Sequence, residues 1–116
     1  MKNYPLYPCK HYEDFKAFMD DTVRTHGSKP AISTFGADGA QTTRTYEKFA
    51  SDVCAIAEAL FDRGLAGKHI AVVSQNSYPS IVCVMAAAYA GGAAVPLDVE
   101  ATPEAIKAMA VFADAA

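Results

Sequence analysis

Apolar residues recur every three to four positions in several stretches of the chain, a period typical of helices with one buried face. The first stretch covers residues 11–25, and Gly27 is expected to end that helix. Its apolar side consists of Tyr12, Phe15, Phe18, Met19 and Val23. Its charged side, which we expect to face solvent, carries Glu13, Asp14, Lys16, Asp20 and Asp21.

A longer helix is predicted over residues 46–63. Its apolar positions are Phe49, Val53, Ile56 and Leu60, with Ala50, Cys54, Ala57 and Phe61 beside them. Thr45 can cap its start by accepting a hydrogen bond from an unpaired N–H group. Gly64 can end it in the left-handed conformation that other residues avoid.

Two short polar and β-branched segments, residues 31–35 and 41–45, are predicted to form a β-hairpin around the turn residues 36–39. The glycines of this turn could instead belong to a phosphate-binding loop. Such a loop requires a following Lys-Ser/Thr pair or a G-x-G-x-x-G motif before a helix, and neither is present. We therefore interpret residues 36–39 as a plain turn.

The run from Asn76 to Asp98 has no charged residue between its ends and is long enough to raise the question of a membrane span. A helix needs about 20 apolar residues to cross a bilayer. Here Pro79 and Ser80 stand near one end, and two glycines and Pro96 interrupt the other. We expect no membrane span but a helix over 78–90, capped by Ser77, and a buried strand over 93–97 with Pro96 at its exit.

Residues 69–74 are apolar without alternation, which is typical of a strand covered on both faces. Thr102-Pro103-Glu104 is expected to open a last helix, whose apolar face consists of Ile106, Met109, Ala110 and Ala113. The predicted fold is α/β: part of a mainly parallel sheet with helices on both faces, preceded by a β-hairpin. Residues 1–116 are expected to form a single domain, with residues 1–10 as an extended lead-in.

Composition narrows the possible partners and the compartment. The net charge is −3, and no basic stripe is present, so nucleic acid is not an expected partner. Cys9, Cys54 and Cys83 are odd in number and far apart, which disfavours a disulfide framework or a zinc site. We interpret Cys54 and Cys83 as small buried apolar residues. Without an apolar signal segment at the start, a cytoplasmic location is expected.

Polar residues follow both strands of the predicted parallel pair, where α/β sheets bind ligands. The residues are Ser74, Gln75 and Asn76 after the first strand and Asp98, Val99 and Glu100 after the second. The simpler interpretation is that they form helix caps and turns, and we favour it. Tyr78 and Tyr89 are expected to pack rather than to line an acyl pocket, and scattered His11, His26 and His69 are expected to have no catalytic or metal-binding role.

Three segments carry a family likeness. Residues 43–49, T-R-T-Y-E-K-F, resemble the "L-T-Y-x-E-L" motif of adenylate-forming enzymes. Residues 68–77, K-H-I-A-V-V-S-Q-N-S, are similar to their "G-D-x-V-A-I-x-x-x-N-S" segment, and residues 89–98, Y-A-G-G-A-A-V-P-L-D, to "K-A-G-A-x-x-V-P-L-D". The chain departs from the pattern at Lys48, where glutamate is usual, and at His69, where aspartate is frequent. The V-P-L-D ending favours bacterial long-chain fatty-acid CoA ligases.

The resemblance implies an ATP-dependent acyl-CoA synthetase-like ligase of fatty acid metabolism. It implies that a carboxylic acid, such as a fatty acid, reacts with ATP to give acyl-AMP and that coenzyme A then takes the acyl group. Magnesium, ATP and coenzyme A are implied for the parent enzyme, and in some relatives the loop matching 98–100 approaches the coenzyme A nucleotide. We assign no catalytic, cofactor-binding or metal-binding residue within the 116 positions.

Family members are roughly five times longer, so the chain is expected to be an N-terminal fragment of a larger adenylate-forming enzyme that is inactive by itself. The alternative is a free-standing α/β binding module that self-associates through a truncated sheet edge. A flavodoxin-like nucleotide-binding domain is a third alternative. We rank it last, because the sequence has no glycine-rich fingerprint after a predicted strand.

Overall fold

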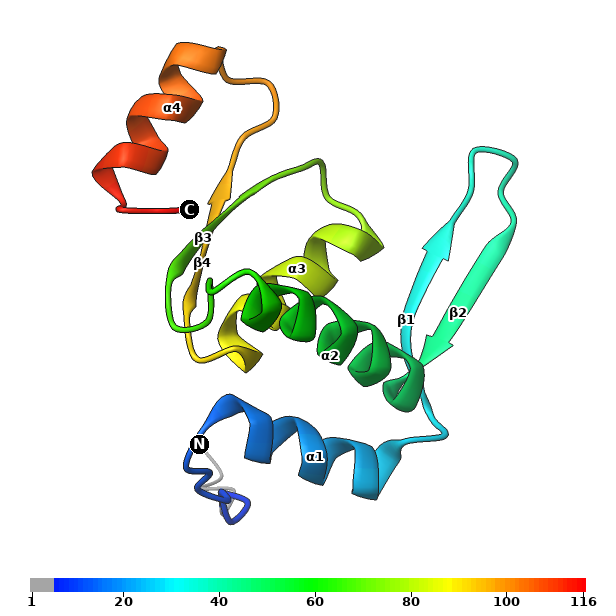
Figure 1. The fold of residues 1–116 in the computed structure, drawn as a ribbon. Helices are drawn as coiled ribbons and strands as arrows, with labels where there is room; N and C mark the ends of the chain where they lie inside the picture. The colour runs from blue at the N-terminus through cyan, green and yellow to red at the C-terminus, as the bar shows by residue number, and fades with distance from the viewer. Residues whose placement is uncertain (1–5) are drawn as a thin grey trace, which may run out of the picture.

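The computed structural model describes residues 6–116 and confirms an α/β fold with a hairpin and a parallel strand pair (Figure 1). Its elements are α1 (Phe15–His26), β1 (Pro30–Phe35), β2 (Gln41–Thr45), α2 (Tyr46–Asp62), β3 (His69–Val73), α3 (Tyr78–Tyr89), β4 (Ala93–Leu97) and α4 (Pro103–Phe112). Of the predicted lead-in, residues 1–5 lie outside the described residues, and residues 6–10 are in neither helix nor strand.

Helix α1 begins four residues later than predicted, because Asp14 acts as its N-cap. The Asp14 backbone is extended, and its carboxylate accepts a hydrogen bond of 2.7 Å from the N–H of Ala17. The helix ends at Gly27 as predicted, but that glycine has φ −43° and is not left-handed. A Cβ atom at this position would lie 2.7 Å from the carbonyl oxygen of Val23, so glycine is needed here for space.

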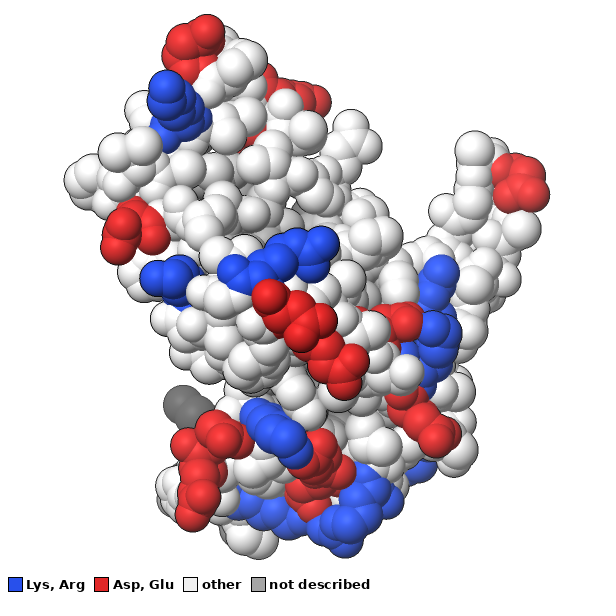
Figure 2. All heavy atoms as spheres, in the orientation of Figure 1, with Lys and Arg blue, Asp and Glu red and all other residues white. Residues whose placement is uncertain are grey.

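Asp21 fastens the segment before α1 to the helix. Its carboxylate accepts hydrogen bonds from Lys10 (2.8 Å), Tyr12 (2.7 Å) and Arg24. These donors, Lys10 foremost, hold the pKa of Asp21 well below its usual value. Charged side chains of both signs lie over the α1 part of the molecule in Figure 2. The predicted solvent-facing side is confirmed for Lys16 and Asp20, whereas the side chain of Asp21 is largely covered.

The hairpin prediction is confirmed: β1 and β2 pair antiparallel, with β1 starting one residue early at Pro30. Gly39 has φ +78° in the turn, and the N–H of Gly36 donates to Ala40 over 2.8 Å. In Figure 1 the hairpin extends away from the helices. Its tip is therefore largely exposed, and Phe35 is 71% exposed.

The main core lies where α1, α2 and α3 meet. Its buried residues are Met19, Phe49, Val53, Ala57, Val82, Ala86 and Ala90. The alanines let α2 and α3 approach closely, and burial of Val53 contributes about 1.5–3 kcal/mol. The buried face of α2 is narrower than predicted, because Ile56 is 38% and Phe61 56% exposed. Thr45 caps α2 and Gly64 follows it with φ +68°, as predicted.

The uncharged run from 76 to 98 folds as a helix, a tight turn and a strand. Ser77 caps α3, Gly91 turns the chain with φ +76°, and β4 pairs in parallel with β3. No helix within residues 6–116 has both the length and the apolar character that crossing a membrane requires. In Figure 1, α4 lies on the other side of the strand pair from α2 and α3.

Pro96 sits inside β4 rather than at its exit. The N–H of Ala93 donates to Lys68 over 3.1 Å, so alternate residues from Ala93 onward direct their backbone groups toward β3. Pro96 falls on the opposite edge. The strand therefore accommodates proline because the missing N–H is not needed for pairing with β3.

The other edge of β3 carries an unpredicted contact with the end of the chain. The N–H of Ala116 donates to His69 over 2.8 Å, and the N–H of Ala71 donates to Ala116 over 2.9 Å. His69 and Ala115 form a parallel bridge, and Nδ1 of His69 lies 2.6 Å from the carbonyl oxygen of Ala113. Because a carbonyl only accepts, Nδ1 is the donor in that contact. β3 thus has neighbours on both sides.

Candidate functional site

The six residues selected from the sequence line one groove at the carboxyl ends of β3 and β4. We call it the strand-end groove, and its volume is about 430 Å³. Its rim consists of Ser74, Gln75, Asn76, Asp98, Val99 and Glu100. Val72, Pro96, Leu97 and Ser80 complete the lining. The parallel pairing brings the two loops together because both strands end at the same edge of the sheet.

The loop after β3 prepares the start of α3. The hydroxyl of Ser74 donates to the carbonyl of Gln75 over 2.7 Å. The hydroxyl of Ser77 accepts a hydrogen bond of 3.3 Å from the N–H of Ser80 and so caps the helix. Ser74 and Ser77 therefore have the turn and cap roles that the simpler interpretation predicts, while Asn76 lines the groove.

The loop after β4 is a tight turn built on Asp98. A carboxylate oxygen of Asp98 accepts from the N–H of Glu100 over 2.9 Å, and the Asp98 carbonyl accepts from Ala101 over 3.2 Å. Thr102 then caps α4 by accepting from Ala105, as predicted. Asp98 thus has its predicted structural role and at the same time places a carboxylate on the rim of the groove.

The charge of the strand-end groove argues against a phosphate ligand. Two carboxylates, Asp98 and Glu100, belong to its lining, and none of its ten lining residues is Lys or Arg. Phosphate groups are normally bound by cationic side chains or unoccupied backbone N–H groups. The residues of this groove therefore do not fit the phosphates of ATP or coenzyme A, and its polar side chains suit uncharged hydroxyl or amide groups.

A side-chain cluster fixes the beginning of α3 beside the groove. The Tyr78 hydroxyl donates to Asp52 over 2.7 Å, and Lys48 pairs with the same carboxylate. The guanidinium of Arg44 lies 4.0 Å from the centre of the Tyr78 ring. Lys48, the departure from the family motif, thus pairs with a residue one turn along α2. The i,i+4 spacing of Lys48 and Asp52 is the local signal that could have indicated part of this cluster, whereas Arg44 and Tyr78 come from distant segments.

Burial, and then the hydrogen bond to Asp52, raises the pKa of Tyr78 to about 12. The hydrogen bonds from Lys48 and then Tyr78 lower the pKa of Asp52. Both shifts follow from geometry, because each partner holds the other in the protonation state that makes the bond. At neutral pH the pair is therefore a neutral phenol and a carboxylate.

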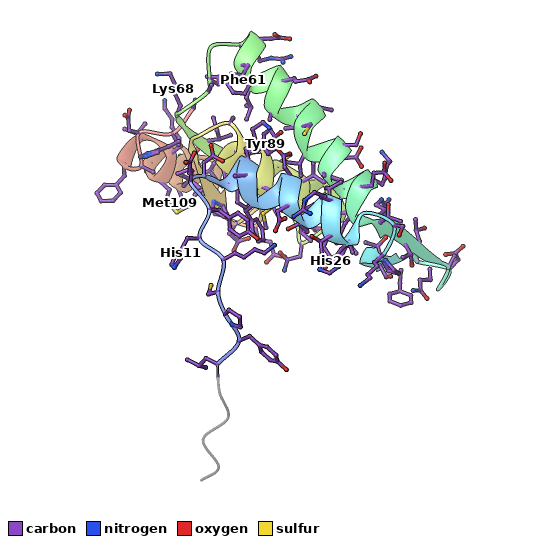
Figure 3. All side chains as sticks on the ribbon, turned by 90° about the horizontal axis from the view of Figure 1, so that it is seen from below. His11, His26, Phe61, Lys68, Tyr89 and Met109 are labelled. Atoms are coloured by element: carbon purple, nitrogen blue, oxygen red, sulfur yellow. The ribbon has the colours of Figure 1, made fainter. Side chains whose placement is uncertain are left out.

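The other residues singled out from the sequence lie away from the strand-end groove. Tyr78 and Tyr89 pack against the core, as predicted. His11 and His26 lie toward opposite ends of α1 in Figure 3, and no group of residues with metal-ligand character gathers within the described chain. Cys54 and Cys83 are half-buried rather than fully buried, because the face of each helix that carries them is only partly covered.

Comparisons with known proteins identify a matching family and solved structures of similar fold. A family model described as AMP-binding enzyme matches residues 19–116. CmiS6 is similar in fold with a TM-score of 0.77 at 18% identity, over 96% of this chain and 27% of that one. The fatty acid AMP ligase from Legionella pneumophila has a TM-score of 0.76 at 20% identity, over 88% and 18%.

The N-terminal subdomain of NpsA from Klebsiella oxytoca has a TM-score of 0.76 at 20% identity, over 90% of this chain and 26% of that one. At identities of 18% to 20%, these similarities concern the fold alone. The chain spans at most about a quarter of the length of each of these structures. No curated protein sequence gives a significant match.

Proposed function

The chain belongs to the AMP-binding enzyme family, and from this premise we propose that it is the N-terminal portion of an acyl-CoA synthetase-like ligase. In the proposed reaction a carboxylate oxygen attacks the α-phosphorus of ATP, and pyrophosphate leaves. The sulfur of coenzyme A then attacks the acyl carbon, and AMP leaves with the electron pair of the broken bond. A fatty acid is the proposed acyl substrate, on the basis of the V-P-L-D segment.

The observation that supports this proposal is the family match across residues 19–116, together with the position of its motifs in the fold. The N-S segment follows β3 and the V-P-L-D segment includes the end of β4, and residues of both segments line the strand-end groove. Members of the family use ATP. Because the groove lacks cationic side chains, we propose that the phosphate-binding and adenylating residues belong to parts of the enzyme outside these 116 residues.

What the chain contributes, in this proposal, is a scaffold. The two loops of the strand-end groove are held by their own turns and by the Tyr78–Asp52 cluster. A rigid rim of hydroxyl, amide and carboxylate groups can position an uncharged polar part of a substrate by hydrogen bonds. No adenylation step is assigned to any residue of the chain.

The test is a chimaera of the Legionella pneumophila fatty acid AMP ligase in which residues 19–116 replace the matching segment. Carboxylate-dependent exchange of pyrophosphate into ATP should be retained, with the isolated chain as a control that shows none. Loss of exchange in a chimaera that still folds, as judged by circular dichroism, contradicts the proposal. Robust exchange by the isolated chain contradicts the assignment of the chemistry to other parts of the enzyme.

A further inference from the structure

Arg44 of β2 connects the β-hairpin to the first residue of α3. Its guanidinium donates a hydrogen bond of 3.2 Å to the hydroxyl of Thr34 in β1 and lies 4.0 Å from the centre of the Tyr78 ring. Arg44 faces Ile32 across the hairpin, so Thr34 is its diagonal neighbour on the same face. The hydrogen bond therefore holds the guanidinium to the hairpin while the same group contacts the start of α3.

The Tyr78 side chain is held by two different elements. Its hydroxyl donates to Asp52, and its ring centre lies 6.2 Å from that of Phe49, with the two rings inclined at 61°. Both of these partners belong to α2, whereas Arg44 contributes the contact from the hairpin. A tyrosine side chain has only two rotatable bonds, so a shift of its ring is passed on to the backbone.

The residues around Tyr78 form the cap of α3 and part of the strand-end groove. Ser77 directly precedes it and accepts a hydrogen bond of 3.3 Å from the N–H of Ser80. The N–H of Ile81 donates to the Ser77 carbonyl over 3.2 Å. Ser80 and Asn76 both line the groove. The position of Tyr78 therefore determines the first turn of α3 and, with it, one wall of the strand-end groove.

The hairpin rests mainly on α2, and α3 packs mainly against α2 and β4. Strand β2 also runs directly into α2 at Tyr46. In Figure 1 the hairpin extends away from the helices, so its base is the part that lies near α3. Arg44 stands at this base, next to the α2 cap Thr45, and it provides a direct contact between the hairpin and the start of α3.

We propose that Arg44 is a positioning residue that couples the β-hairpin to the strand-end groove through Tyr78. A displacement of the hairpin alters the contact between the guanidinium and the ring, and the ring passes the change to Ser77 and the first turn of α3. Such coupling is reciprocal, so a ligand that fills the groove should also order the hairpin. The coupling does not depend on which ligand the groove binds, and its test is therefore independent of the proposed ligase activity.

The first experiment removes the hairpin end of this contact. Thr34→Val deletes the hydroxyl that accepts from Arg44 and keeps a β-branched strand residue. Amide exchange of Ser80, in the first turn of α3, should accelerate at least about threefold. Thr43→Val is the matched control, because the Thr43 hydroxyl shares a hydrogen bond of 2.8 Å with Ser33 on the opposite face of the hairpin. This control should leave the exchange of Ser80 unchanged.

The second experiment changes Arg44 itself. Arg44→Met removes the donor and the charge and should accelerate exchange of Ser80 at least about fivefold, which corresponds to about 1 kcal/mol. Arg44→Lys keeps the charge but lacks the planar guanidinium, so it should restore only part of the protection. The N–H of Glu100 bonds to Asp98 in the other loop of the groove and should exchange at the same rate in every variant. The Glu100 signal thus separates the coupling from a general loss of stability.

Combining the substitutions tests whether they act on one contact. In the Arg44→Met background, Thr34→Val should have no further effect on Ser80, because both changes break the same contact. Additive effects, or equal acceleration at Ser80 and Glu100, would overturn the proposal. Unchanged exchange of Ser80 in an Arg44→Met variant that folds, as judged by circular dichroism, would do the same. If that variant does not fold, Arg44→Lys and Thr34→Val decide the question by the same two signals.

Discussion

The phenol of Tyr78 donates a hydrogen bond of 2.7 Å to the carboxylate of Asp52, and this bond joins the start of α3 to α2. The two residues are 26 positions apart in the sequence. Since Tyr78 follows Ser77, the cap of α3, the bond also fixes the loop that lines the strand-end groove. One side-chain contact therefore links the helical core to the candidate site.

Tyr78→Phe should lower the free energy of unfolding by about 1–2 kcal/mol, because a half-buried bond to a charged acceptor is lost. Urea denaturation of both proteins measures the difference. Tyr12→Phe is the matched control: its hydroxyl also donates to a carboxylate, Asp21, but on an exposed surface. An equal or larger loss in that control contradicts the special role of Tyr78.

The stability of the chain at alkaline pH should depend on the same hydrogen bond between Tyr78 and Asp52. The pKa of Tyr78 is raised to about 12 in the folded chain, from a reference value of 10.0. The neutral phenol is therefore favoured by folding, and this contribution is complete below pH 10 and is lost as the pH rises through about 12. Stability should fall over that window, and Tyr78→Phe should remove part of the fall. Ultraviolet absorbance of tyrosinate identifies the late-titrating group.

Acid should destabilise the chain through Asp21. Its pKa is lowered in the folded chain, with the hydrogen bond from Lys10 as the largest cause. The stabilisation is therefore present above the carboxyl's reference pKa of 3.8 and is lost progressively as the pH falls below it. Asp21→Asn should flatten the acid limb of a stability–pH curve. Asp38→Asn, in the hairpin turn, provides the comparison, and identical curves for the two variants would argue against Asp21.

Gly92 should tolerate a side chain less well than Gly64. A Cβ atom on Gly92 would lie 2.1 Å from the carbonyl oxygen of Lys68, at the point where β4 starts beside β3. Gly92→Ala should therefore cost more than about 2 kcal/mol. Gly64 has φ +68° and open space around it, so Gly64→Ala should cost about 1–2 kcal/mol from backbone strain alone. Thermal denaturation ranks the two variants, and the reverse order contradicts the close approach.

ATP should not bind to the strand-end groove of the isolated chain. Asp98 and Glu100 contribute negative charge to its lining, and no lining residue is cationic. A titration with ATP followed by NMR should leave the amide signals of residues 74–77 and 98–100 unchanged. The double variant Asp98→Asn and Glu100→Gln removes the repulsion and provides a comparison. Saturable shifts in the parent chain at micromolar ATP would refute the electrostatic argument.

Local chemistry made several elements predictable. Thr45, Ser77 and Thr102 are helix caps, and each was identified from a hydroxyl residue placed just before an apolar repeat. The start of α1 was misplaced because Tyr12 fits the apolar period, whereas the carboxylate of Asp14 ends the extended segment and begins the helix. A period alone does not distinguish a residue of the helix from one that precedes it.

Contacts between distant segments were not predictable. The strand-end groove followed from the rule that parallel strands end together, but the pairing of Ala115 and Ala116 with β3 had no local signal. Helix α4 has the predicted apolar face, yet none of its residues is buried, and Phe112 is 94% exposed. Periodicity shows which side of a helix is apolar and does not show what covers it.

Pro96 makes the two outer edges of the β3–β4 pair differ in their capacity for backbone hydrogen bonding. On the outer edge of β4 the nitrogen of Pro96 carries no hydrogen, so a strand placed there would lack one backbone hydrogen bond. On the other edge of the pair, the backbone of β3 contains no proline, and His69 and Ala71 form backbone hydrogen bonds with Ala116. Pro96 thus makes the two edges of the strand pair chemically unequal, because only the outer edge of β3 presents an unbroken series of backbone N–H groups.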